Sequence, residues 1–68
     1  MAMIHLIELT VSEDNTKCTF VIENITTIIG STRTRIYTNG GDYVCVNESV
    51  EEITNRIKEI LYGKEEKL

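Results

Sequence analysis

The sequence predicts a small α+β fold: an antiparallel β-sheet of three to five strands, followed by one C-terminal helix packed on one face. Two observations predict it. Short runs rich in β-branched and aromatic residues alternate with turn-forming residues over the first two thirds of the chain. The last third carries apolar residues at helical spacing behind a capping motif. With 68 residues, the chain is expected to form a single small domain over 1–68.

The N-terminal part predicts two strands, at about 3–11 and 16–23, separated by the turn sequence "SEDN". The second strand alternates well, because Cys18, Phe20 and Ile22 fall on one face. The first strand has apolar residues on both faces. This mixture indicates a strand partly covered on both sides or an oligomer contact.

The segment "NITTII", residues 24–29, has two interpretations. It either continues the second strand after a kink or forms a third strand at about 25–30. Its many β-branched residues disfavour a helix. The turn sequence "GST" follows, and two further strands are expected at about 33–38 and 42–47.

The hydrophobic pattern selects the register of the last two strands. A loop of three residues, 39–41, places Ile36, Val44 and Val46 on one face, whereas a loop of two residues does not. Gly41 suits the third loop position, which requires a positive φ. The opposite face then carries Arg33, Arg35, Tyr37, Tyr43 and Cys45.

A helix is expected at about 49–62. Ser49 and Glu52 form a capping box, and Arg56 stands four residues after Glu52 in the order that favours an ion pair. Gly63 is a typical C-terminal stop, and residues 63–68 are expected to fray. The apolar stripe that should face the sheet consists of Val50, Ile53, Ile57, Ile60 and Leu61.

Composition and charge exclude several classes of function. The formal net charge of −4 argues against nonspecific nucleic-acid binding, which needs many basic contacts to phosphates. Two cysteines and one histidine, without metal-ligand spacing, predict reduced thiols and no metal or other cofactor. No signal-peptide pattern and no apolar stretch of about 20 residues is visible. We therefore expect a cytoplasmic protein without membrane insertion.

The sequence contains the short segments Met3-Ile4-His5-Leu6, "ITTI" from Ile25, "YTNG" from Tyr37, "YVCV" from Tyr43 and "ESVEEI" from Glu48. Together these segments resemble the small FlbD-type (SwrD-type) flagellar and swarming-motility proteins. The first turn is longer than is usual in that family, and Gly41 is an addition. The resemblance implies this fold and a bacterial origin; it carries over no enzymatic activity and no catalytic residues.

A catalytic site is not expected, because His5, Cys18 and Cys45 are the whole supply for a nucleophile–base pair. The candidate partner-binding face consists of Arg33, Arg35, Tyr37 and Tyr43. Arginine and tyrosine are enriched at protein interfaces and also stack on bases, although the same residues occur in ordinary cross-strand pairs on a solvated face.

These observations predict a non-catalytic bacterial assembly or adaptor module, FlbD-like, that acts through contacts with an unknown protein partner or through self-association. A homo-oligomer is expected, because so small a domain buries little core and has open strand edges. The alternative is a nucleic-acid-binding accessory protein of a phage or mobile element that uses the Arg and Tyr residues of the sheet face.

Overall fold

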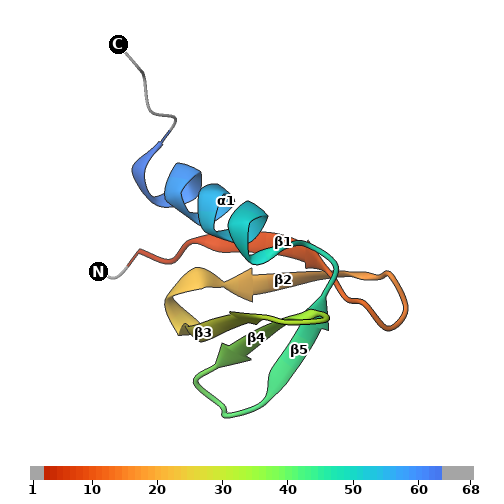
Figure 1. The fold of residues 1–68 in the computed structure, drawn as a ribbon. Coiled ribbons are helices and arrows are strands. Elements are labelled where there is room, and N and C mark those ends of the chain that lie inside the picture. Colours follow the sequence, from red (N-terminus) through yellow and green to blue (C-terminus); the bar gives the residue numbers. More distant parts are fainter. Residues whose placement is uncertain (1–2, 64–68) are drawn as a thin grey trace.

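The structure is a computed structural model, and it describes residues 3–63. Residues 1–2 and 64–68 lie outside the described part, including most of the tail that we expect to fray. The α+β fold class is confirmed (Figure 1). The elements are β1 (Leu6–Thr10), β2 (Lys17–Val21), a 3₁₀ turn η1 (Ile22–Asn24), β3 (Ile25–Gly30), β4 (Thr34–Thr38), β5 (Tyr43–Val46) and α1 (Val50–Tyr62).

Most strands are shorter than the sequence suggests. β1 begins at Leu6 rather than residue 3, although Ile22 N–H still donates to the His5 carbonyl at 2.8 Å. The turn η1 ends β2 at Val21 and separates it from the next strand. The ambiguous segment "NITTII" therefore forms a third strand, β3, and is not an extension of β2.

The five strands form two antiparallel sheets that meet at one corner. The first sheet has the order β1-β2 and the second the order β3-β4-β5. A bridge between Val11 and Val46 links the end of β1 to the end of β5. Beside it, Ser12 N–H donates to the Cys45 carbonyl at 2.9 Å, and Asn47 N–H donates to the Thr10 carbonyl at 2.9 Å.

The β4–β5 hairpin has the predicted register. Thr34 pairs with Val46, and Ile36 pairs with Val44. Gly41 has a φ of 92°, a backbone conformation that glycine adopts without steric cost. Its N–H donates to the Thr38 carbonyl at 3.0 Å and closes the three-residue loop.

The hydrophobic core lies between the sheets and α1, which packs against β1 (Figure 1). The structure resolves the mixed pattern of the first strand: Ile7 is 2% exposed, whereas Leu6 is 52% exposed. Cys18, Ile25, Ile28, Val44, Ile57 and Leu61 pack around the core. The buried residues are Ile7, Leu9, Phe20, Ile22, Ile36, Val46 and Ile53.

The helix α1 has the predicted Ser49 N-cap, but the reciprocal half of the capping box and the predicted ion pair do not form. Ser49 Oγ accepts a hydrogen bond from Glu52 N–H at 3.0 Å, and Gly63 N–H closes the last turn on the Glu59 carbonyl at 2.8 Å. Arg56 Nη2 donates to the backbone carbonyl of Glu8 at 3.0 Å instead of pairing with Glu52. Within residues 3–63, no helix is long and apolar enough to cross a membrane.

Candidate partner-binding face

The Arg–Tyr face, formed by Arg33, Arg35, Tyr37 and Tyr43, lies on the outer surface of the β4–β5 hairpin. The register places Tyr37 directly opposite Tyr43. Residues at alternate positions of a strand share a face, so Arg35 lies beside Tyr37 and turns away from the buried Ile36. Arg33 immediately precedes β4 and is exposed.

Three side chains of this face are stacked. The rings of Tyr37 and Tyr43 have centroids 5.2 Å apart at an angle of 44°. The Arg35 guanidinium carbon lies 5.1 Å from the centroid of Tyr43, within cation–π range. Since a guanidinium carries its N–H donors in its own plane, contact with a ring face can leave these donors available to a partner.

Arg35 is a permanent cation on this face, because an arginine side chain is not deprotonated in proteins. The Tyr37 hydroxyl, followed by the Coulombic effect of Tyr43, raises the pKa of the Arg35 guanidinium still further above its ordinary value. The Tyr43 ring beside it is 49% exposed, which is a large fraction for an aromatic side chain.

Next to the stack lies a surface depression of about 410 Å³. Arg33, Arg35 and Tyr43 of the Arg–Tyr face line it, but Tyr37 does not. Its other lining residues are Ser31 and Thr32 from the β3–β4 turn and Cys45 from β5. The sequence predicts "GST" as a turn, and the predicted face does not include Ser31 and Thr32. Their position directly before Arg33 is the signal that could have identified them.

Of the other candidate reactive side chains, His5, Cys18 and Cys45, only Cys45 lines the depression. The His5 N–H donates to Glu23 Oε1 at 2.9 Å, and the His5 ring Nδ1 contacts Glu23 Oε2. These contacts with the side chain and then the backbone of His5 lower the pKa of Glu23. Cys18 packs against the core from β2, whereas Cys45 lines the depression, and both are free thiols. No group of three or more potential metal ligands occurs within residues 3–63.

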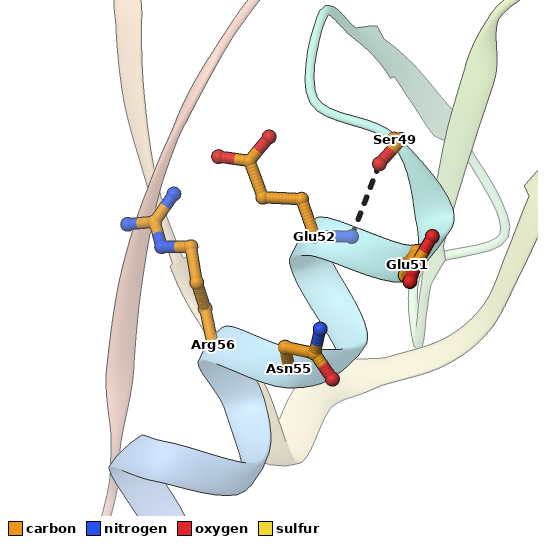
Figure 2. Close-up of a pocket in the computed structure, with 5 residues that line it drawn as sticks. All are labelled: Ser49, Glu51, Glu52, Asn55 and Arg56. Atoms are coloured by element: carbon orange, nitrogen blue, oxygen red, sulfur yellow. Dashed lines mark hydrogen bonds between the residues drawn. The ribbon is translucent and has the colours of Figure 1, made fainter.

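A second depression, of about 370 Å³, lies at the start of α1 and is lined by Ser49, Glu51, Glu52, Asn55 and Arg56 (Figure 2). Two of its polar side chains already stabilise the fold. The Ser49 hydroxyl caps the helix, and Arg56 donates to the Glu8 carbonyl. The Arg–Tyr face is the better candidate site, because its side chains are not committed in this way.

Comparison with known proteins adds no independent assignment. No protein-family model, no curated protein and no solved structure matches the chain. The functional interpretation of the Arg–Tyr face therefore depends on its geometry, its exposure and its charge.

Proposed function

We propose that the protein is a non-catalytic, FlbD-like bacterial assembly or adaptor module that binds a protein partner through the Arg–Tyr face. The observation that carries this proposal is the stack of Tyr37, Tyr43 and Arg35 beside an open depression. Tyrosine and arginine are over-represented among the residues that dominate binding energy at protein interfaces. A pre-stacked cluster also loses less side-chain entropy when a partner binds.

The chemistry of the depression favours a partner that presents a carboxylate. Two arginines line it, together with the hydroxyls of Ser31 and Thr32. Arginine binds a carboxylate through two parallel N–H···O bonds, and hydroxyl groups can donate to the remaining lone pairs. We therefore expect the partner to place an acidic side chain beside Tyr43.

Site-specific photo-crosslinking in the native host tests this proposal. A photoreactive residue at Thr32, on the rim of the depression, should yield an adduct of one defined mass. The same residue at Thr19, an exposed threonine on β2, is the matched control. The combined substitution Arg33→Ala plus Arg35→Ala should abolish the Thr32 adduct. Equal adducts from both positions, or an adduct that survives the double substitution, would refute the proposal.

The stacked aromatic and arginine side chains also support a second candidate function, the binding of single-stranded nucleic acid in a phage or mobile element. Such stacks bind bases with little sequence preference. Binding would weaken steeply between about 50 and 200 mM salt and would be lost in the double arginine variant. Fluorescence anisotropy with a labelled oligonucleotide distinguishes the two functions, because an adaptor with net charge −4 should show no binding.

A further inference from the structure

The outer edge of β3 is an open strand edge. β3 is the terminal strand of the β3-β4-β5 sheet. The Thr38 N–H of β4 donates to the Asp42 carbonyl, on the side of β5. The Arg33 carbonyl accepts from the Ser31 N–H, on the side of β3. Because the bonding direction alternates along a strand, the residues of β4 that bond to β3 are Arg35 and Tyr37.

Their partners on β3 are Ile29 and Thr27, so the backbone N–H and C=O groups of Ile28 and Gly30 point to the free edge. Gly30 is exposed, and as a glycine it can expose only backbone. Thr27 is exposed as well, and Ile29 is 41% exposed. The edge is therefore accessible to a further strand.

This edge has little of the usual protection against strand pairing: a register shift between Ile25 and Thr27 interrupts the start of β3, but Thr27–Gly30 pairs regularly with β4. Residues 24–32 contain no charged residue and no proline, and β-branched residues dominate them. Natural proteins normally protect an exposed edge with lysine, proline or a covering element. An uncharged, exposed and regular edge over Thr27–Gly30 is suited to the addition of a further strand.

We propose that β3 pairs with β3 of a second copy of this chain, antiparallel and around a two-fold axis at Ile28. In this register Ile28 faces Ile28 of the second copy, and Thr27 faces Ile29 of the second copy. The Thr27–Ile29 contacts are non-hydrogen-bonded pairs, in which side chains approach most closely. Each contact covers an exposed Ile29 side chain with the methyl group of a threonine.

Charge favours a second copy over an unrelated strand. Glu23 lies in η1 before β3, where its carboxylate also contacts His5, and Arg33 follows β3 in the turn to β4. An antiparallel two-fold pairing brings the Glu23 end of one β3 towards the Arg33 end of the other. The neighbouring ends of the two strands then carry opposite charges, and no like charges face each other along the pair.

The pairing would create one continuous sheet of six strands. Thr27 and Ile29 share the outer face with Tyr37 and Arg35, which are their partners on β4. The two Arg–Tyr faces would then lie on the same surface of the joined sheet. Such a dimer would bind a partner with two epitopes more tightly than a single copy could, without any new contact.

The oligomeric state, measured by analytical ultracentrifugation, tests this inference. An edge-to-edge contact buries little area, so we expect one chain per particle at about 10 µM and two at about 1 mM. Two double variants of exposed positions then test the register. Thr27→Glu plus Ile29→Glu places like charges opposite each other twice and should abolish the dimer. Thr27→Lys plus Ile29→Glu places opposite charges there and should preserve it.

The two variants are matched controls for each other, because both replace the same two residues and both carry Ile29→Glu. A wild-type protein that stays monomeric at about 1 mM overturns the proposal, and so does equal behaviour of the two variants. Hydrogen exchange of wild-type protein needs no substitution. The Ile28 and Gly30 amides should exchange several-fold more slowly as the protein concentration rises. Exchange rates that do not depend on concentration would overturn the proposal. Slower exchange that appears only when a foreign peptide is added would overturn it as well.

Discussion

The outer edges of β1 and β3 differ in how many of their outward backbone N–H and C=O groups are already hydrogen-bonded within the chain. In β1, odd-numbered residues bond to β2, because Val11 N–H donates to Thr16 and Ile22 N–H donates to His5. The backbone N–H and C=O groups of Glu8 and Thr10 therefore point away from β2, towards the outer edge. The Glu8 carbonyl accepts from Arg56, and both Thr10 backbone groups are bonded by the β5–α1 connection.

β3 has no such closure among the described residues, and its exposed stretch carries no charge. The β1 edge is closed by long polar side chains from the C-terminal part of the chain. Exposed apolar side chains alone therefore do not identify an open strand edge. Met3, Ile4 and Leu6 are exposed in and before β1, yet within the described part of the chain the outward backbone groups of β1 are bonded and those of β3 are not.

The largest expected effect comes from opening the β1 edge at Glu48. The Glu48 carboxylate accepts from Thr10 N–H at 2.9 Å and from Thr10 Oγ1 at 2.9 Å. Glu48→Ala leaves the Thr10 N–H without this partner and should lower the free energy of unfolding by about 1.5–3 kcal/mol. Urea denaturation measures the loss. Glu51→Ala, at an exposed site, should change the free energy of unfolding by less than about 0.5 kcal/mol. Equal losses in the two variants would show that Glu48 does not stabilise the β1 edge.

The same contact has a pH signature. Partial burial raises the pKa of Glu48. Hydrogen bonds from the Thr10 backbone and hydroxyl together lower it by more than this, so the net pKa lies below its ordinary value. A depressed folded pKa contributes stability above the unfolded pKa of about 4.3 and loses it as the pH falls through the folded pKa. Wild type should therefore lose more stability than Glu48→Gln between about pH 5 and 3. Parallel pH profiles would show that Glu48 contributes nothing.

A somewhat smaller effect is expected where β3 meets α1. A Cβ atom on Gly30 would lie 2.7 Å from Val50 Cγ2, which is too close without movement of Val50. Gly30→Ala should destabilise the protein by about 1–2 kcal/mol. Adding Val50→Ala should remove the clash, so the double variant should lose less than the sum of the single losses. Gly40→Ala is the control, because nothing lies near its Cβ position.

The contact of Arg56 with the Glu8 carbonyl should contribute less, because it is a single exposed hydrogen bond. Arg56→Ala should lower the free energy of unfolding by about 0.5–1.5 kcal/mol. Lys58→Ala, on an exposed part of the same helix, controls for the loss of a cation. If the two variants have the same thermal midpoint, Arg56 does not close the edge of β1.

The smallest effect is expected for Glu23→Gln, since its contact with His5 is exposed. The substitution weakens the attachment of the segment before β1 without touching the core. The His5 amide, which donates to Glu23 Oε1, should exchange its hydrogen faster with solvent. Glu59→Gln, at an exposed helix position, should leave this exchange rate unchanged.

Local signals predicted much of the fold. The glycine at position 41 and the alternation around Ile36 determine the β4–β5 register, and Ser49 determines the helix start. These features depend on residues close together in the chain, so their chemistry is readable without tertiary structure. The Arg–Tyr stack follows directly from that register, because Tyr37 and Tyr43 become cross-strand neighbours.

Contacts between distant segments could not be predicted in this way. Periodicity could not distinguish the inward Ile7 from the outward Leu6, because both are equally apolar. Arg56 has an acidic residue at ideal helical spacing, yet it bonds to a strand 48 residues away. Ser31 and Thr32 join the depression only because the turn between β3 and β4 folds them beside Tyr43.

The tyrosine stack gives the protein a built-in optical reporter. The chain has no tryptophan and three tyrosines, so tyrosines account for its near-ultraviolet absorbance and emission. Two of the three belong to the stack, while Tyr62 lies at the end of α1 and is highly exposed. A ligand that binds at Tyr43 should change the near-ultraviolet circular dichroism of the unlabelled protein. A Tyr62→Phe background would leave the two stacked rings as the only tyrosines that contribute to that signal.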